Sequence, residues 1–365
     1  MDFQNDKNMK NKKDYDDKYI YSYSDKSKVT EKNVAKGKRK SKKLYILGLV
    51  VSIILGLMGS ILLYAYNKLD SINYKSLGES GELLLSESDS TDLLQEPKVL
   101  NVIMFGVDRR EQTDNHSRSD STMLLSVDNR RKKIKLTSLM RDTWVKIPGH
   151  AQNRLNTAIA YGGEKLAIQT VQNTFGIKMD KYATVDFESF KKIVDIIGGI
   201  DLSLSAAEAN YINGDLEYYR SPSPRLPVAD GTYHLDGDKT LSYARARKVA
   251  TPEGLHDDFA RTYRQRRVLK IIVESMKKCN IAQILRIVDE AGPYIDTNLK
   301  KSEIITLSKN IMSYLNYQLE EFRLPTNDNV QNATKNGMAV LVIPDMSKAK
   351  YDLAKFIYED TVQYK

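Results

Sequence analysis

Hydrophobic residues follow two kinds of pattern along this chain: one uninterrupted run near the N-terminus, and a series of short periodic segments after residue 98. The run, Leu44–Tyr66, contains 23 residues without a charge, which is long enough to cross a bilayer as one helix. A polar, lysine-rich segment precedes it and an acidic, serine-rich segment follows it. We therefore predict four regions: a disordered basic tail at 1–43, a transmembrane helix at 44–66, an acidic stalk at 67–97 and one domain at 98–365.

From Lys98 onward, short strand patterns alternate with helical ones, which predicts a layered α-β-α domain with a mixed central sheet. Strands are expected at 99–105, 122–127, 134–139, 182–185, 200–204 and 339–342. Helices are expected at 155–161, 164–175, 187–197, 237–245, 258–277, 280–291, 301–316 and 348–358. Residues 205–230 show no regular period and are expected to be irregular, whereas the strand at 339–342 is expected to join the sheet.

The charges on the two sides of the apolar run predict its orientation. Residues 1–43 hold 14 Lys and Arg against 7 Asp and Glu, and residues 67–97 hold 2 against 7. Cytoplasmic flanks of membrane spans are enriched in basic residues, so we expect the N-terminus inside the cell and the domain outside. A cleaved signal peptide is disfavoured, because the leading segment is too long and no A-x-A pattern follows the run.

Small side chains recur every four residues within the run. Such a stripe lets two membrane helices approach closely, which suggests weak self-association, although ordinary membrane-helix composition is the simpler explanation. The residues of the stripe are Gly48, Ser52, Gly56 and Ser60.

Composition narrows the chemistry that the chain can carry. Hydrophobic residues make up 41% and charged residues 28%, as in an ordinary globular protein. The single cysteine, Cys279, excludes an intrachain disulfide and a cysteine-based metal site. Glycine-rich phosphate loops, G-x-S-x-G and H-E-x-x-H are all absent from the sequence. The four histidines share no metal-ligand spacing and are expected to be structural: His116, His150, His234 and His256.

One predicted helix carries an ordered set of polar side chains in the segment D-F-A-R-T-Y-R-Q-R-R-V-L at 258–269. A rotation of about 100° per residue places Asp258, Arg261, Thr262 and Gln265 on one side, and the final V-L continues that side. Asp258 is expected near the helix start, as its N-cap. Arginines anchored at the edge of a core suit a ligand with several anionic oxygens, such as a diphosphate. A solvated basic helix is the alternative.

Acids and arginines also follow the predicted strands at the sheet edge where open α/β folds bind ligands. Asp108 comes after the first strand, Asp120 leads into the second, and Arg141 follows the third. Carboxylates suit Mg²⁺ or Mn²⁺ and arginines suit phosphate oxygens, so together they predict a metal-assisted phosphoryl-transfer site. Each residue taken alone has a structural alternative as a turn residue, a cap, an ion-pair member or a surface charge.

Eight segments, in this order and spacing, resemble the LytR–CpsA–Psr family, and they cover roughly residues 98–290. The departures are Met140, where the family usually has proline, Asp257, where it often has glycine, and the segment 248–257, which is longer than usual. The segments are V-D-R-R at 107–110, R-S-D-S-T-M-L-L-S-V-D at 118–128, S-L-M-R-D-T at 138–143, N-T-A-I-A-Y-G-G at 156–163, V-D-F-E-S-F at 185–190, I-G-G-I-D at 197–201, D-G-T-Y-H-L-D-G-D-K-T-L-S-Y-A-R-A-R at 230–247 and D-F-A-R-T-Y-R-Q-R-R at 258–267.

This resemblance implies a membrane-anchored phosphotransferase that moves a glycopolymer, such as teichoic acid or capsular polysaccharide, from a polyprenyl diphosphate to peptidoglycan. By position, Asp108 and Asp120 match the metal-binding acids. Asp258 matches an acid that orients arginines or assists proton transfer, and the general base stays open between Asp108 and Asp258. The residues matching the family's diphosphate site are Arg118, Arg141, Arg245, Arg247, Arg261 and Gln265. The expected catalytic residues are Asp108, Asp120, Arg141 and Asp258.

Two other functions compete with transfer. A membrane-bound transcriptional regulator would use the basic residues for DNA, but the arginines are expected outside the cell and no helix-turn-helix is present, so no nucleic-acid partner is expected. The basic tail is explained by orientation and by attraction to anionic lipid. A hydrolase that only releases the lipid-linked diphosphate is the second competitor.

Overall fold

The computed structural model describes residues 52, 67, 69–77, 93–108, 118–179, 181–314 and 316–359, and the statements below concern these. The predicted basic tail, the predicted span apart from Ser52, and much of the predicted stalk lie outside the described residues. Three positions of the small-residue stripe lie there too, so weak self-association stays a prediction. Among the described helices, none is long and apolar enough to cross a membrane.

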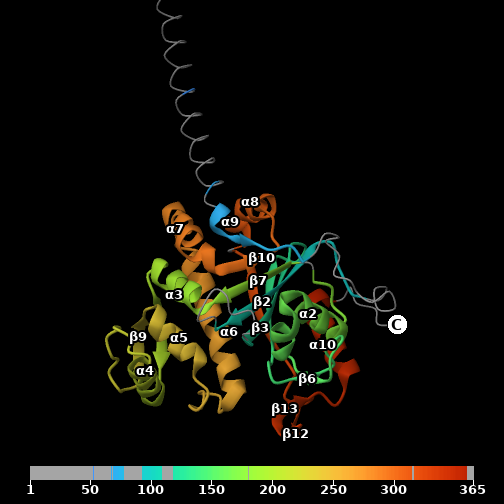
Figure 1. The fold of residues 1–365 in the computed structure, drawn as a ribbon. Helices are drawn as coiled ribbons and strands as arrows, with labels where there is room; N and C mark the ends of the chain where they lie inside the picture. Colours follow the sequence, from blue (N-terminus) through green and yellow to red (C-terminus); the bar gives the residue numbers. More distant parts are fainter. Residues whose placement is uncertain are drawn as a thin grey trace, which may run out of the picture. The chain divides into compact units, whose positions relative to one another are not determined.

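A seven-stranded mixed sheet forms the centre of the domain, in the order β1-β10-β7-β2-β3-β4-β11 (Figure 1). Strand β2 is parallel to β7 and antiparallel to β3, and β4 is antiparallel to β3 and parallel to β11. The ends of β2 and β4 and the start of β3 therefore share one edge of the sheet. The strands are β1 Asn73–Tyr74, β2 Val99–Val107, β3 Ser119–Asp128, β4 Lys133–Leu139, β7 Lys181–Asp186, β10 Ile295–Thr297 and β11 Gln318–Leu324.

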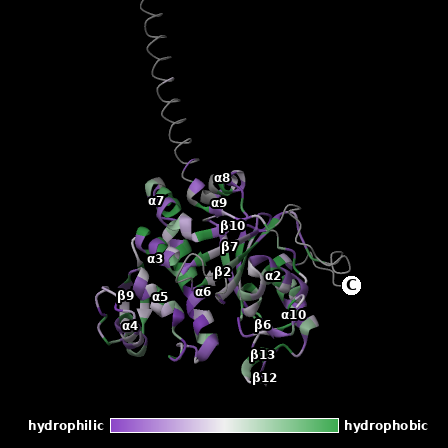
Figure 2. Cartoon of the chain, in the orientation of Figure 1, coloured by the Kyte–Doolittle hydropathy of each residue, from purple (hydrophilic) through white to green (hydrophobic). Residues whose placement is uncertain are grey.

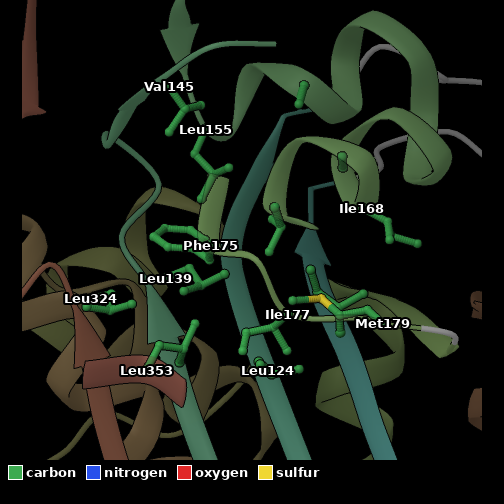
Figure 3. Packing of buried hydrophobic residues seen from close by; sticks show 14 of the residues in the cluster. Leu124, Leu139, Val145, Leu155, Ile168, Phe175, Ile177, Met179, Leu324 and Leu353 are labelled. Carbon is green, nitrogen blue, oxygen red and sulfur yellow. The ribbon is translucent and has the colours of Figure 1, made fainter. Parts of the chain in front are cut away.

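Helices α2 (Thr157–Phe175) and α10 (Met346–Tyr358) cover one face of the sheet. Alternate residues of β2, including Ile103 and Phe105, turn to this face, as the two-residue period of a strand requires. Figure 3 shows the resulting core, in which Phe175 of α2 and Leu353 of α10 pack with residues of the sheet. The predicted break between two helices is a kink inside α2, where Gly162 and Gly163 have non-helical backbone angles.

The opposite face of the sheet carries α3 (Phe187–Ile196), α5 (Gly237–Arg245), α6 (Asp257–Met276) and α7 (Ile281–Ala291). A second core joins α3, α5 and α6 to α4 (Ala206–Tyr218) and to the hairpin of β8 (Ile200–Leu204) and β9 (Gly231–Leu235). Figure 2 shows hydrophobic stretches in the sheet, whereas the helices around it carry both hydrophobic and hydrophilic residues. A central mixed sheet in an α/β domain is thus confirmed.

Several predictions of secondary structure were wrong. Residues 205–230 contain helix α4, whose start is fixed by a capping box between Ser205 and Glu208. Strand β13 (Met338–Val342) does not join the central sheet; it pairs with β12 (Gln331–Lys335), and the sheet edge is formed by β11. The helix expected at 301–316 is divided into α8 (Lys301–Lys309) and α9 (Ile311–Tyr314). The smaller elements are η1 Leu69–Ser71, β5 Trp144–Val145, β6 Asn153–Arg154 and η2 Gly292–Tyr294.

Gly237 lets the start of α5 approach the backbone of α3 closely. A Cβ at this position would lie 2.5–2.9 Å from the carbonyl oxygen, Cα and carbonyl carbon of Lys191, closer than real contacts allow. We expect Gly237→Ala to lower the free energy of unfolding by about 1–3 kcal/mol, as overpacked sites do. Urea unfolding measures this, with Gly214→Ala as the control, because a Cβ at Gly214 meets nothing; equal stability of the two variants would contradict the expectation.

Candidate functional site

Two cavities meet at the sheet edge where β2 and β4 end. A charged cavity of about 310 Å³ is lined by Asp108, Arg118, Asp120, Arg141, Arg154 and Asn156. A mainly apolar cavity of about 390 Å³ lies between the sheet and the helices α3, α5, α6 and α7. Asp120 lines both cavities, so they adjoin each other at this residue. The apolar cavity includes Met104 and Met123 of the sheet, Phe187, Phe190 and Ile193 of α3, Leu241 of α5 and Ile287 of α7.

Asp120 joins arginines from two distant segments. Its Oδ1 accepts a hydrogen bond from Arg141 Nη1 at 2.5 Å and another from Arg261 Nη1 at 3.4 Å. Arg141 leaves the end of β4 and Arg261 lies in the second turn of α6, 120 residues later. The predicted meeting of early acids with late arginines is therefore present in the fold.

Asp258 lies behind these arginines and is 9% exposed. Its Oδ1 is 2.5 Å from Arg261 Nη2 and 3.4 Å from Arg141 Nε, but neither contact has hydrogen-bond geometry. Burial raises the pKa of Asp258 above the usual value, although Arg261 and Arg141 oppose the shift. Burial likewise lowers the pKa of Arg261, against the attraction of Asp258. Charges held in so little water interact strongly with an anion that enters beside them.

Asp258 was expected as the N-cap of α6, which was wrong: His256 is the N-cap and Asp258 is in the first turn. Its carboxylate still lies at the positive end of the helix dipole. Thr262 Oγ1 donates to the Asp258 carbonyl oxygen at 2.7 Å, which ties the next turn to the first. Within the described lining, Asp258 belongs to neither cavity, unlike the other predicted site residues.

Arg245, at the end of α5, is fixed between two aromatic rings. Its guanidinium lies 4.7 Å from the ring centre of Tyr219 and 5.2 Å from that of Phe187, and Nη2 donates to the Tyr219 hydroxyl at 2.5 Å. Burial lowers the pKa of Arg245, but Tyr219, Asp215 and Asp108 outweigh it and raise the pKa overall. The attraction from Asp108 places Asp108 and Arg245 within electrostatic reach of each other.

The side of α6 that faces the apolar cavity changes character along its length. Arg261 and Gln265 line the cavity near Asp120, and only apolar residues of α6 line it further on. From Arg261 to Met276 the helix rises about 22 Å at 1.5 Å per residue. Of the predicted stripe, Arg261, Gln265 and the apolar residues after them line the cavity, whereas Asp258 and Thr262 do not. These apolar residues are Val268, Leu269, Ile272, Val273 and Met276.

The remaining predicted residues border the same region. Arg247 is exposed and lines the polar end of the apolar cavity, and Arg118 is exposed in the charged cavity. Tyr219, Arg154 and Asn156 were not predicted. Tyr219 lay in a segment expected to be irregular, and Arg154 had no signal other than its place just before a matching motif.

Arg154 forms the outer wall of the charged cavity. Its Nε and Nη2 donate to the Ala339 carbonyl oxygen at 3.0 and 2.5 Å, and Nε lies 3.5 Å from Asp142 Oδ1. These contacts connect β6 to β13 and direct a third arginine toward the acids Asp108 and Asp120. Asn156, at the N-terminus of α2, is 4% exposed beside it. The charged cavity thus presents guanidinium groups on several sides of two carboxylates.

Asp257 has the backbone angle φ = +53°, in the left-handed region that favours glycine. The resemblance had already marked this position as one where glycine is usual. We expect Asp257→Gly to be about 1 kcal/mol more stable than Asp257→Ala, because both lose the carboxylate but only alanine keeps the strain. Thermal and urea unfolding compare the two variants; an alanine variant as stable as the glycine variant would contradict the strain.

The sequence from residue 60 to residue 355 matches the model of the LytR_cpsA_psr family. The chain belongs to the LytR_cpsA_psr family. It is 27% identical over 289 residues to the Bacillus subtilis polyisoprenyl-teichoic acid–peptidoglycan teichoic acid transferase TagV, covering 78% of this chain and 70% of TagV. It is 28% identical over 310 residues to the transferase TagU of Bacillus mycoides, covering 83% of this chain and 93% of TagU.

The fold is that of solved family members. One structure is the LytR-CPS2A-psr family protein YwtF, or TagT, with bound octaprenyl pyrophosphate lipid; TagT is a Bacillus subtilis protein. Its TM-score with this chain is 0.54 at 21% identity, and the match covers 74% of this chain and 96% of the other. The likeness shows that the two chains share their fold.

Proposed function

We propose that this LytR_cpsA_psr protein transfers a teichoic acid or similar glycopolymer from a polyprenyl diphosphate to peptidoglycan, forming a phosphodiester. The observation that carries the proposal is that the apolar cavity and the arginine-rich charged cavity adjoin each other at Asp120. A polyprenyl diphosphate has the same two-part character, with a long apolar tail and an anionic head. The TagV and TagU relatives are named as transferases of teichoic acid to peptidoglycan, and TagT binds a polyprenyl diphosphate.

The tail would lie along the apolar residues of α6, and the diphosphate would lie at the boundary of the two cavities. On the lipid side, this boundary is lined by Arg245, Arg247, Arg261 and Gln265. The three arginines of the charged cavity border it on the other side: Arg118, Arg141 and Arg154. Donors on both sides of a diphosphate fix its orientation and stabilise the charge that develops during transfer.

In the proposed reaction, the oxygen of a peptidoglycan sugar hydroxyl attacks the phosphorus that carries the glycopolymer. The bond from that phosphorus to the bridging oxygen breaks, polyprenyl phosphate leaves, and the hydroxyl proton is released. Because phosphoryl transfer needs mostly positioning and charge stabilisation, the arginines supply most of the chemistry. We assign Asp258 to orienting Arg141 and Arg261, since it is buried behind them; of the two acids considered as the base, only Asp108 borders the charged cavity.

The acids of the charged cavity fit a divalent cation. Among the described residues, no cluster of three or more His, Cys, Asp and Glu side chains could hold a metal alone. Magnesium, however, commonly takes one or two carboxylates and completes its shell with substrate phosphate oxygens and water. Asp108 and Asp120 are the residues that would hold Mg²⁺ or Mn²⁺, which when bound neutralises phosphate charge.

The proposed location is the cell membrane, with a cytoplasmic N-terminus, an anchor at 44–66 and the domain outside. This layout rests on the uncharged run and its flanking charges. It brings the site to the compartment that contains peptidoglycan. Protease treatment of intact cells tests it, because only an external domain is cleaved; protection of the domain would favour the regulator.

Product analysis tests the reaction itself. Purified full-length protein is incubated with a polyprenyl-diphosphate-linked glycopolymer, with and without a peptidoglycan acceptor. Transfer predicts a phosphodiester-linked glycopolymer–peptidoglycan product that forms only with acceptor. Free glycopolymer phosphate, at the same rate with and without acceptor, would identify a hydrolase instead.

A further inference from the structure

A second groove lies at the edge of the domain where the chain enters it. Its volume is about 460 Å³, and it runs between η1–β1 and the start of α8. Leu69 and Ile72 form one apolar wall, and Leu299 and Ile304 form the other. We call this the entry groove; it shares no lining residue with the two cavities of the candidate site.

Basic and aromatic side chains border the entry groove. Lys300 is exposed at the start of α8, and Lys301 beside it pairs with Asp70. Tyr74 is 51% exposed although it also lines the groove. An apolar floor bordered by lysines and a tyrosine is the combination found where proteins meet the head groups of an anionic membrane.

The chain itself limits how far this groove can lie from the proposed anchor. Tyr66 ends the uncharged run, and Leu69 follows three residues later, which is at most about 11 Å of extended chain. Element η1 also contacts α7. Ile287 of α7 lines the apolar cavity, and so does Met276, the last residue of α6. Element η1 therefore lines the entry groove and contacts the helix that supplies Ile287 to the wall of the apolar cavity.

We propose that the entry groove rests on the bilayer and binds the head group of an anionic phospholipid. This contact seats the apolar end of the cavity at the membrane, so that a polyprenyl tail enters beside α7 without crossing water. The inference rests on the membrane anchor of the proposed function, and it adds a lipid site separate from the donor site.

Tryptophan quenching tests the contact in full-length protein reconstituted into phosphatidylglycerol–phosphatidylcholine nanodiscs. The single tryptophan, Trp144, is first replaced by phenylalanine, and Tyr74→Trp then reports on the groove. Brominated acyl chains are expected to remove more than half of its emission. Lys300→Trp is a second reporter in the same groove, in case the first variant does not fold. Tyr218→Trp is the matched control, because Tyr218 is 78% exposed on α4; its emission is expected to be unchanged.

The outcomes of this experiment test the groove contact separately from the membrane anchor and from the transfer reaction. Unquenched emission from both groove reporters, or equal quenching at position 218, would overturn the membrane contact. Lys300→Glu with Lys301→Glu is expected to reduce the quenching of Tyr74→Trp to its level in pure phosphatidylcholine; no reduction would overturn the anionic head group. A chain that fails to enter nanodiscs refutes the anchor and this inference together. The same lysine variants are expected to keep full transfer in detergent, where the donor needs no bilayer.

Discussion

Transfer is expected to fall at least about 100-fold in Asp120→Ala and in Arg247→Ala, with both proteins still folded. Asp120 lines both cavities and fixes Arg141 through a 2.5 Å hydrogen bond, so its loss disturbs the charged cavity and the lipid boundary together. Arg247 is exposed at the polar end of the apolar cavity, so its removal leaves the core unchanged. Initial rates of glycopolymer transfer to peptidoglycan measure the effect.

The matched control for these variants is Arg225→Ala. Arg225 is an exposed arginine that donates to the Ser223 carbonyl oxygen and lines neither cavity among the described residues. Its transfer rate is expected to match that of the unmodified protein. Circular dichroism and the unfolding midpoint establish that the variants are folded. Near-normal transfer by both Asp120→Ala and Arg247→Ala would refute the site.

The largest loss of stability is expected for Arg264→Met, which should lower the free energy of unfolding by about 3–5 kcal/mol. Arg264 is fully buried, and its Nε and Nη2 donate to Glu208 Oε1 at 3.1 and 2.8 Å. Without it, Glu208 keeps a charge in the core with its cationic partner removed. Urea unfolding measures the loss.

Two further variants separate this buried charge from lost packing. Lys270→Met, at an exposed position of the same helix, is expected to change stability by less than about 0.5 kcal/mol. Combining Arg264→Met with Glu208→Gln removes both charges, keeps an acceptor for the capping box of α4 and should recover a large part of the loss. A double variant as unstable as Arg264→Met alone would show that the contacts to the loop carbonyls of Ala246, Val249 and Ala250 dominate.

Elements with a strong period of their own could be predicted from the sequence, and so could the site residues that they carry. The buried strand before Asp108 is mostly apolar, the strand before Arg141 alternates apolar and polar residues along most of its length, and α6 shows its helical period directly. Helix α4 was missed although its capping box is present in the sequence, because the polar residues that follow hide the period. Strand β11 was missed because its glutamates and arginine interrupt the apolar pattern, although the sheet accepts them at its edge.

The features that were not predicted from the sequence arise from contacts between segments that are distant along the chain. Arg264 and Glu208 are 56 residues apart, and no local pattern identifies either as the partner of the other. Arg154 enters the charged cavity because it donates to Ala339 of β13, a strand that was predicted to join the central sheet but pairs with β12. The contact between Asp120 and Arg261 agrees with the prediction because the sequence pattern had identified each of the two residues separately.

The apolar cavity also bears on how the protein distinguishes between carriers of different length. A volume of about 390 Å³ is that of a pocket for a drug-sized molecule, so under the proposed function it would enclose only the isoprene units nearest the diphosphate. Adding isoprene units that extend out of the cavity is then expected to change neither binding nor turnover. We therefore expect selection for the geometry of the first isoprenes and indifference to the total number of units.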